Sequence, residues 1–255
     1  MTPIRSEKSR SAQRSIPNQE REFLERYRPA DFPRPSVTVD IVVLTIVDAE
    51  LRLLLVKRKD HPFKDHWALP GGFVRVGNGQ QDQGEDLDAA AARELEEETS
   101  LKPNMAYLEQ LYTFGNAGRD PRMRVITVAY YALVRPDLAS LVRAGGDASD
   151  ANWFAVQSLK KVPLAFDHAE IIKKAIERIV GKLDYSDIVF NLVPQTFTIP
   201  ELRSVREIII GTPQDPGNFR RRFNRMLEDG IIEGAPGKRI TTSKPATVYR
   251  FKQPK

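Results

Sequence analysis

Residues 85–101 read EDLDAAAARELEEETSL, a segment that joins an alanine run to a high density of carboxylates. Alanine is a strong helix former, so we predict a helix over Leu87–Glu98. On that helix Glu94, Glu97 and Glu98 have the spacing i, i+3, i+4, which places them within an arc of about 100°. Like charges this close repel by about 0.2–0.5 kcal/mol per pair, and a bound cation would offset the repulsion. Hard oxygen ligands suit Mg²⁺ or Mn²⁺, whereas composition alone favours a plain solvated acidic face.

The wider spacing around this helix favours the metal site. Gly72, Glu85 and residues 93–101 resemble the Nudix box, G-x5-E-x7-R-E-U-x-E-E-x-G-U, in which U is aliphatic. The Nudix family hydrolyses nucleoside diphosphates linked to another group. The resemblance implies that three glutamates are metal ligands and that these three and an arginine partner are catalytic: Glu94, Glu97, Glu98 and Arg93.

Two departures from the family pattern stand beside the predicted metal site. Twelve residues separate Gly72 from Glu85, where the pattern has five, and the extra residues lie in 76–84 (VGNGQQDQG), which we predict to be a flexible loop. Ser100 replaces the glycine that favours a left-handed helix end, at a cost of about 1–2 kcal/mol if that geometry is kept. Neither change removes a carboxylate, so the sequence leaves open whether the chain hydrolyses anything.

The segments around the box predict an α+β fold. Val37–Val47 and Leu51–Arg58 are rich in apolar and β-branched residues and predict a β-hairpin. A second helix is predicted over Ala169–Val180, capped by Asp167. By resemblance this part is a Nudix α/β/α sandwich with a mixed sheet. Further strands are predicted at Trp67–Leu69, Tyr107–Phe114, Arg124–Val134 and Trp153–Val156, and a loop at Ala144–Asp150.

Several cations near the box are candidates for holding phosphates. Lys57 and Arg58 end a predicted strand, and three arginines sit in a turn before another. Charge-assisted hydrogen bonds suit phosphate oxygens, although solvated arginines on a hairpin are an equal alternative. Trp67 and Phe114 could stack on a base but are more often core residues. The candidate ligand-binding residues are Arg58, Gly72, Arg122 and Arg124, with Lys57 and Arg119 less secure.

The C-terminal sixty residues have a different pattern. Thr198-Ile199-Pro200-Glu201 predicts a capping box at the start of a helix Pro200–Ile210, which Gly211 can end. A second helix is predicted over Asn218–Glu228, with its aromatic and aliphatic residues on one face and its cations on the other. Guanidinium groups suit phosphates and guanine edges, and asparagine suits adenine. The alternative is an amphipathic surface helix with a solvated basic face.

Two helices followed by strands near Ile231–Glu233 and Thr247–Phe251 resemble a winged helix-turn-helix, with a basic loop at Lys238-Arg239 as the wing. The resemblance implies that the second helix reads double-stranded DNA. The candidate DNA-binding residues are Asn218, Arg220, Arg221, Arg222, Arg225, Lys238 and Arg239.

A Nudix domain followed by a winged helix resembles the Nudix-related transcription regulators of NAD metabolism, the NrtR type. The likeness includes the runs WALPGGF (67–73), YTFG (112–115), AFDH (165–168) and NFRR (218–221). It implies a homodimer whose Nudix domain binds ADP-ribose or a related nucleotide. It also implies that this ligand changes the affinity of the protein for a palindromic operator. Many members sense without hydrolysing.

Charge and composition agree with two unlike domains after a tail. We predict a mobile tail over 1–34 with a short helix near Glu20–Tyr27, a Nudix domain over 35–182 and a winged helix over 183–255. The net charge is +3 in 1–34, −4 in 35–195 and +6 in 196–255, which places a polyanion partner at the end of the chain.

The absence of cysteine excludes disulfides and thiolate chemistry. The three histidines show no metal-ligand spacing. No apolar run reaches the ~20 residues that span a bilayer, and no signal-peptide pattern is present, so we expect a cytoplasmic protein without membrane contact. The favoured interpretation is a DNA-binding regulator with an ADP-ribose-type effector and Mg²⁺ or Mn²⁺. The alternative is an ADP-ribose pyrophosphatase whose C-terminal module dimerises or binds partners.

Overall fold

The computed structural model describes residues 18–79, 82–142, 145, 148–183, 187–240 and 244–252. The chain divides into two compact units, Met1–Arg34 and Pro35–Lys255. In the first unit the predicted short helix is confirmed as α1 (Asn18–Arg26), followed by a 3-10 turn at Pro29–Asp31. The rest of the predicted tail, residues 1–17, lies outside the described residues. Among the described residues no helix is long and apolar enough to cross a membrane.

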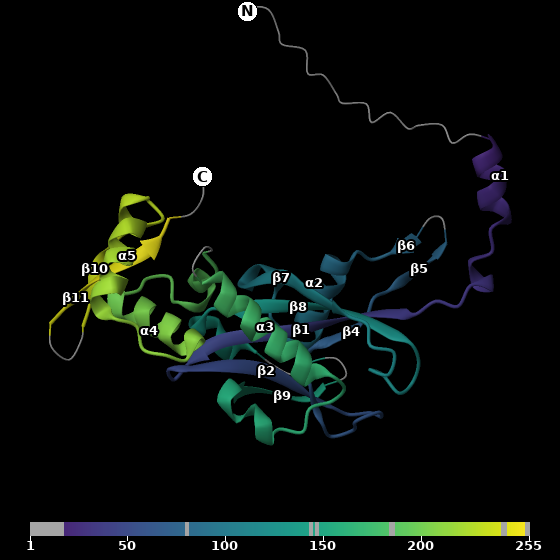
Figure 1. The fold of residues 1–255 in the computed structure, drawn as a ribbon, viewed down its shortest axis with the longest axis horizontal. Coiled ribbons are helices and arrows are strands. Elements are labelled where there is room, and N and C mark those ends of the chain that lie inside the picture. Colours follow the sequence, from purple (N-terminus) through teal and green to yellow (C-terminus); the bar gives the residue numbers. More distant parts are fainter. Residues whose placement is uncertain are drawn as a thin grey trace, which may run out of the picture. The chain divides into compact units, whose positions relative to one another are not determined.

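A seven-stranded mixed sheet organises the second unit (Figure 1). Its main path runs β3-β2-β1-β8-β7, with β4 pairing β1 and β9 pairing β2. The strands are β1 (Ser36–Val47), β2 (Glu50–Arg58), β3 (Trp67–Ala68), β4 (Gly71–Phe73), β7 (Ala106–Phe114), β8 (Val125–Val134) and β9 (Ala148–Ala155). The long central pair β1 and β8 is parallel, whereas the other pairs are antiparallel. The predicted mixed sheet is therefore confirmed.

The predicted hairpin forms because its turn has the right backbone. Asp48 and Ala49 have φ of 54° and 58°, the left-handed pair that a two-residue turn needs to match the twist of its strands. One prediction in the sheet is wrong. The predicted loop Ala144–Asp150 includes the start of β9, which pairs with β2 from Ala148 to Ala155. Residues 144, 146 and 147 of that loop lie outside the described residues.

Two helices cover opposite faces of the sheet. Alternate residues of β1 divide between them: Ile41 packs in the cluster that contains Leu95 of α2 (Leu87–Thr99). Val42 packs in the cluster that contains Ile172 of α3 (His168–Lys182). This alternation follows from the period of two in a strand, and it makes the predicted α/β/α sandwich. Figure 1 shows α3 lying along one face of the sheet.

The seven-residue insertion before Glu85 is not the open loop that was predicted. It folds into a two-stranded hairpin, β5 (Val76–Gly79) with β6 (Asp82–Gly84), around residues 80 and 81, which are outside the described residues. Its base is held by the Arg75 amide, which donates to Glu85 Oε1 at 2.8 Å. This bond joins the hairpin to Glu85, the first glutamate of the box, which precedes α2.

The end of α2 keeps the left-handed geometry that the family pattern assigns to glycine. Ser100 has φ 62° and ψ 10°, and its amide donates to the Glu96 carbonyl. We therefore expect Ser100→Gly to raise the free energy of unfolding by about 1 kcal/mol, since glycine removes the left-handed penalty. Urea denaturation measures the change. Ser100→Ala, which keeps a Cβ, should give no gain; equal stabilisation by both variants would contradict this explanation.

The C-terminal part is a helix-turn-helix with a β-hairpin. Its elements are α4 (Ile199–Ile210), α5 (Pro216–Glu228), β10 (Ile232–Arg239) and β11 (Ala246–Phe251). The predicted capping box is confirmed, because Thr198 and Glu201 each accept from the other's backbone amide. Gly211 ends α4 in a left-handed conformation, as predicted. The remaining elements are short 3-10 helices at Pro103–Met105, Pro136–Leu141, Val156–Lys161 and Asp187–Leu192.

One apolar core runs from the sheet into this C-terminal part. The same cluster of buried residues contains Ile172 and Ile179 of α3, Leu202 and Ile209 of α4, and Phe223 of α5. Because α3 has apolar contacts on the sheet side and on the α4 side, it is shared by both parts of the unit.

Candidate functional site

Arg93 gathers the carboxylates of the box. Its Nε and Nη2 donate to Glu85 at 2.9 and 2.5 Å, and Nη1 donates to Glu94 at 2.6 Å and to Glu97 at 3.0 Å. The bonds from Arg93 to Glu85 lower the pKa of Glu85 to about 2. The predicted partnership of Arg93 with the glutamates is thus present. Burial raises the pKa of Glu94, whose carboxylate packs against Gly72.

Gly72 is required by this packing. A Cβ on Gly72 would lie 2.4 Å from Glu94 Oε1, closer than real Cβ contacts allow. Any larger residue at this position must push the buried carboxylate away. The glycine at the start of the box therefore makes room for Glu94, in addition to its position in the wall of the cavity described below.

The donor set of the box suits a hard divalent cation, since it consists of carboxylate oxygens. Glu98 lines a cavity and accepts from the Gly71 amide at 3.0 Å, while Glu97 is half-exposed and bonded to Arg93 and Arg75. Among the described residues no group of three His, Asp or Glu side chains is placed to hold a metal ion. A cation at this site would therefore compete with Arg93 and Arg75 for Glu97.

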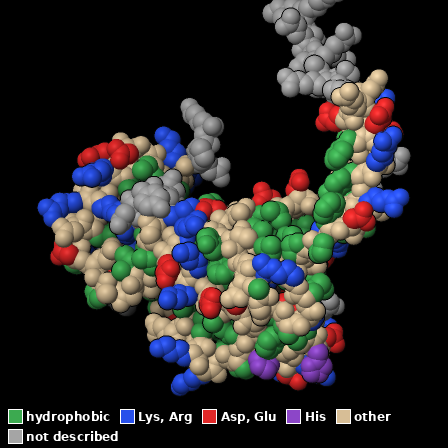
Figure 2. Space-filling view, turned by 45° about the vertical axis from the view of Figure 1, so that its right-hand side comes forward, with side chains coloured by type: hydrophobic (Ala, Val, Ile, Leu, Met, Phe, Trp, Pro, Cys, Tyr) green, Lys and Arg blue, Asp and Glu red, His purple; other side chains and the backbone are tan. Residues whose placement is uncertain are grey.

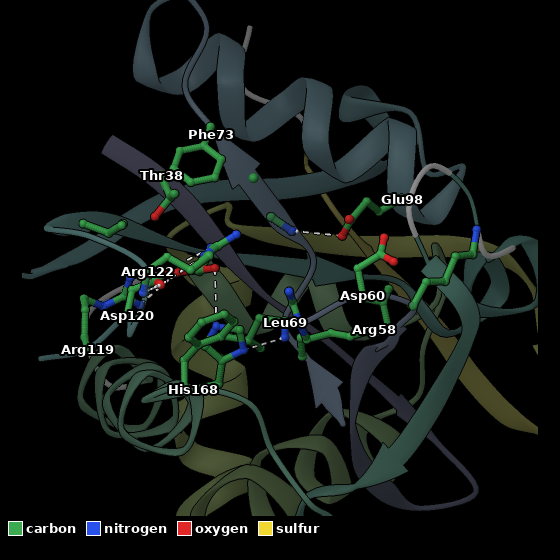
Figure 3. Close-up of a pocket in the computed structure, with 18 of the residues that line it drawn as sticks. Thr38, Arg58, Asp60, Leu69, Phe73, Glu98, Arg119, Asp120, Arg122 and His168 are labelled. Atoms are coloured by element: carbon green, nitrogen blue, oxygen red, sulfur yellow. Dashed lines mark hydrogen bonds and ion pairs between the residues drawn. The ribbon is translucent and has the colours of Figure 1, made fainter. Parts of the chain in front are cut away.

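A cavity of about 300 Å³ opens beside the box, at the edge of the sheet where β2, β4 and the loop before β8 meet. Figure 3 shows Arg58 and Glu98 on one side of it and Arg119 and Asp120 on the other. The volume is at the small end of the range for ligand sites. Its polar lining residues are Thr38, Asp40, Lys57, Arg58, Lys59, Asp60, His61, Glu98, Arg119, Asp120, Arg122 and His168.

Two arginines and two aromatic rings form the exposed mouth of this cavity. The Arg58 guanidinium lies 5.0 Å from the centre of the Phe166 ring, and Arg122 lies 5.9 Å from Phe166 and 5.5 Å from Phe73. Burial and the nearby charge of Arg122 lower the pKa of Arg58. Two guanidinium groups beside aromatic rings suit a phosphate flanked by a flat ring system.

The structure separates the predicted ligand-binding residues. Arg58, Gly72 and Arg122 line the cavity. Arg124 is absent from the lining; it is exposed, and its guanidinium donates instead to the Asn116 carbonyl at 3.0 Å. The prediction for Arg124 is therefore not supported by the geometry. Lys57 and Arg119, the less secure candidates, both line the cavity, whereas Trp67 and Phe114 pack against the apolar core as the alternative predicted.

A buried ionic network that reaches the cavity wall was not predicted. Arg119 donates to Asp167 at 2.9 and 2.7 Å and to Asp40 at 3.3 Å, with only 4% of its side chain exposed. The Asp167 carboxylate is thus occupied, and its predicted capping bond to α3 is absent. His168 is 3% exposed, and its Nδ1 accepts from the Leu69 amide at 2.9 Å.

The aromatic pair Phe73 and Phe166 was also missed as part of the site. Both residues lie in runs that carry the family likeness, WALPGGF and AFDH, but isolated aromatics give no sign of function by pattern alone. Phe166 has φ of 51°, a left-handed conformation that a bulky residue adopts only under constraint. This backbone strain at the cavity wall marks Phe166 as a site residue, but it is visible only in the structure.

His168 gives the fold a pH dependence. Burial lowers the pKa of His168, so the unfolded chain takes up a proton below pH ~6.5 that the folded chain resists. Stability is therefore retained above that pH and lost as the pH falls, by up to about 1.4 kcal/mol per pH unit. We expect His168→Gln, whose amide oxygen can still accept from Leu69, to flatten the stability curve between pH 7 and 5. Thermal unfolding over this range measures it, and an unchanged slope would contradict the assignment.

The predicted DNA-reading face lies on α5. Phe219 and Phe223 are buried, and four candidates are exposed: Asn218, Arg220, Arg221 and Arg225. A hollow between α4 and α5 is lined by Asn218, Arg221, Arg222 and Arg225, with Arg206 at its floor. Lys238 is exposed on the hairpin. Figure 2 shows Lys and Arg side chains exposed on one face of the molecule.

Two of the predicted DNA contacts are engaged inside the protein instead. Arg222 is half-buried and donates to the Leu183 carbonyl at 2.9 Å. Arg239 donates to Glu201 and to the Thr196 carbonyl, both at 2.8 Å. The predicted basic loop is also wrong in its bounds, because Lys238 and Arg239 belong to β10. The connection after Ile240 includes residues 241–243, which are outside the described residues.

Comparison with known proteins gives matches along most of the chain. A family model for the NUDIX domain matches residues 37–175, and one for the NrtR DNA-binding winged helix domain matches residues 189–251. The chain is 37% identical over 232 residues to the ADPR-responsive transcriptional repressor NtrR of Acinetobacter baylyi, an alignment that covers 91% of the chain and 88% of the relative.

Two solved structures are similar as well. NrtR of Shewanella oneidensis in complex with a 27mer DNA has a TM-score of 0.72 and 36% identity, over 85% of this chain and 93% of that one. The Nudix domain of the same protein in complex with ADP-ribose has a TM-score of 0.52 and 35% identity, over 63% and 98% of the two chains.

Proposed function

The chain belongs to the Nudix family, and within it to the NrtR type, in which a winged-helix domain follows the Nudix domain; on this premise we propose that it is an ADP-ribose-responsive transcription repressor. The Nudix domain, residues 35–182, binds the nucleotide, and the winged helix, residues 183–255, binds duplex DNA. The relative from Acinetobacter baylyi is named an ADPR-responsive transcriptional repressor. One Shewanella oneidensis structure contains DNA and the other contains ADP-ribose. The protein acts as a homodimer, whose two winged helices meet the halves of a palindromic operator.

The observation that carries the proposal is the mouth of the Nudix cavity. Arg58 and Arg122 are two cations that line the cavity, and both lie against the Phe166 ring. ADP-ribose offers a pyrophosphate for the guanidinium groups and an adenine ring for an aromatic face. Asp60, which also lines the cavity, can accept from ribose hydroxyls.

The same cavity connects the nucleotide to the box. Glu98 belongs to the cavity wall and to the three glutamates that we propose as ligands of Mg²⁺ or Mn²⁺. The cation would neutralise pyrophosphate charge and, in an enzyme, activate a water. Since all four box side chains are kept, the second candidate function is hydrolysis of ADP-ribose, with the C-terminal module serving dimerisation or partner binding.

The metal assignment gives a matched pair of variants on one helix. We expect Glu97→Gln and Glu98→Gln each to weaken Mn²⁺ binding by about tenfold and to abolish any hydrolysis, because each removes a charged ligand. Glu96→Gln changes an exposed glutamate between them and should leave both unchanged. Calorimetric titration with Mn²⁺ measures the affinity without depending on turnover. Equal losses in all three variants would mean that overall charge, and no specific site, binds the ion.

The experiment that tests the proposal is a thermodynamic cycle. An operator is selected from random duplexes by the purified protein, and its affinity is measured with and without ADP-ribose. The affinity for ADP-ribose is then measured with and without operator. Linkage requires both ratios to be equal, typically about 5–150-fold for regulated pairs. Conversion of ADP-ribose to AMP with no duplex binding at low salt would favour the hydrolase and end the repressor proposal.

A further inference from the structure

Helix α3 contacts the nucleotide cavity at one end and the DNA-binding module at the other. It spans His168–Lys182, which at 1.5 Å per residue makes a rod of about 22 Å. Its apolar face packs in the same core as α4 and α5. A rigid element that touches two sites can couple them only if each end has specific contacts, and both ends of α3 have them.

The first end lies in the cavity wall. His168 accepts from the Leu69 amide, and the N-cap residue Asp167 holds Arg119 through two hydrogen bonds. Leu69, Arg119 and His168 all line the cavity. Any ligand that changes the position of Arg119 therefore acts on the first turn of α3 through a buried ion pair, which water screens only weakly.

The second end is hydrogen-bonded to two arginines of the DNA-binding module. Leu183, the C-cap of α3, is buried, and its carbonyl accepts from Arg206 of α4 and, at 2.9 Å, from Arg222 of α5. A helix C-terminus carries partial negative charge, so two guanidinium groups are well matched to it. Arg206 is 5% exposed and fixed, whereas Arg222 reaches Leu183 from the hollow beside the exposed face of α5.

On the proposed function, we infer that α3 transmits nucleotide binding to the DNA-reading helix and that the contact from Arg222 to the Leu183 carbonyl is the coupling contact. Arg222 is thus a positioning residue for α5, and its neighbours Arg221 and Arg225 meet the DNA. A shift of α3 along its axis changes the Arg222 bond directly, because the acceptor is the carbonyl of Leu183, the C-cap of the helix. A hydrogen bond is sensitive to displacements of a few tenths of an ångström.

The thermodynamic cycle described above tests this inference with Arg222→Gln and Arg222→Lys against Arg221→Ala. We expect Arg222→Gln to reduce the coupling factor at least fivefold toward one, while ADP-ribose affinity without DNA changes less than twofold. Arg222→Lys, which restores a cationic donor, should recover part of the coupling. Arg221→Ala should weaken operator binding but keep the wild-type coupling factor. Thermal unfolding checks that each variant is folded.

The outcomes separate the inference from the function on which it rests. A wild type that binds both ligands with linkage, and Arg222 variants with the same linkage, would overturn the coupling contact alone. An Arg221 variant that loses coupling as Arg222→Gln does would overturn it too, since the effect would then follow from any weakened DNA contact. A wild type that binds neither ADP-ribose nor duplex would reject the proposed function and this inference with it.

Discussion

Arg122→Ala is expected to weaken ADP-ribose binding by roughly 10–150-fold, the range set by losing 1.5–3 kcal/mol of hydrogen bonds to a charged group. The guanidinium has two roles at the cavity mouth. It stacks near Phe73 and Phe166, and it pairs with Asp120 at 2.8 Å. Asp120 is 4% exposed, so the variant also leaves a buried carboxylate without its main partner beside an anionic ligand. Both effects reduce affinity.

Arg124→Ala is the matched control, since it removes the same side chain two residues along the same connection. Arg124 is exposed, bonded to the Asn116 carbonyl and absent from the cavity wall. The affinity of Arg124→Ala for ADP-ribose should differ from that of the wild type by less than twofold. Calorimetric titration of both variants, with circular dichroism to confirm folding, makes the comparison. Equal losses would mean that the two arginines act through net charge and that the cavity mouth has been assigned wrongly.

The sequence could not predict that Arg122 lines the cavity and that Arg124 does not. The apolar and β-branched residues of β1 and β2, the alanine run of α2 and the turn after β1 were sufficient to predict the central hairpin of the sheet and the helix of the box. Periodicity reports which face of an element is buried, because it averages over many residues. The contrast between Arg122 and Arg124 depends on the path of one irregular connection, which carries no periodic signal.

The ionic contacts show the same limit in the C-terminal domain. A helical wheel places Arg222 at the edge of the basic face, about 60° from the buried Phe219, and we predicted it as an exposed cation. The wheel cannot include the C-terminus of α3, which approaches α5 from outside the module and supplies the Leu183 carbonyl. Arg239 was predicted on the wing for a similar reason, although Glu201 of the capping box lies within its reach. Long arginine side chains are directed by partners that are distant in the sequence.

The insertion before Glu85 could be seen in the sequence but its structure could not. Its glycines and polar residues are typical of a loop, and no alternation marks strands of three or four residues. The structure shows why glycine is needed: a Cβ on Gly77 would lie 1.8 Å from the Asp82 carbonyl oxygen of the opposite strand. The close approach of two backbones, which composition suggests only as flexibility, makes the hairpin.

The largest effect on DNA binding is expected from Arg221→Ala. Arg221 is exposed on α5, where its guanidinium donates to Asn218, itself a candidate for base contact. Loss of a guanidinium that meets a phosphate reduces the slope of log affinity against log salt by about one. Loss of one that reads a guanine costs about 1–3 kcal/mol and relaxes discrimination at that base pair.

Arg239→Ala separates these effects from a change in domain stability. Arg239 was also predicted to bind DNA, but its guanidinium is bonded to Glu201 and Thr196. Its removal should lower the free energy of unfolding by about 1 kcal/mol and leave the salt slope unchanged. Fluorescence anisotropy of the selected duplex between 50 and ~200 mM salt gives both slopes. A slope that falls in Arg239→Ala and not in Arg221→Ala would place the DNA on the hairpin and away from α5, because only released counterions, and not stability, change the slope.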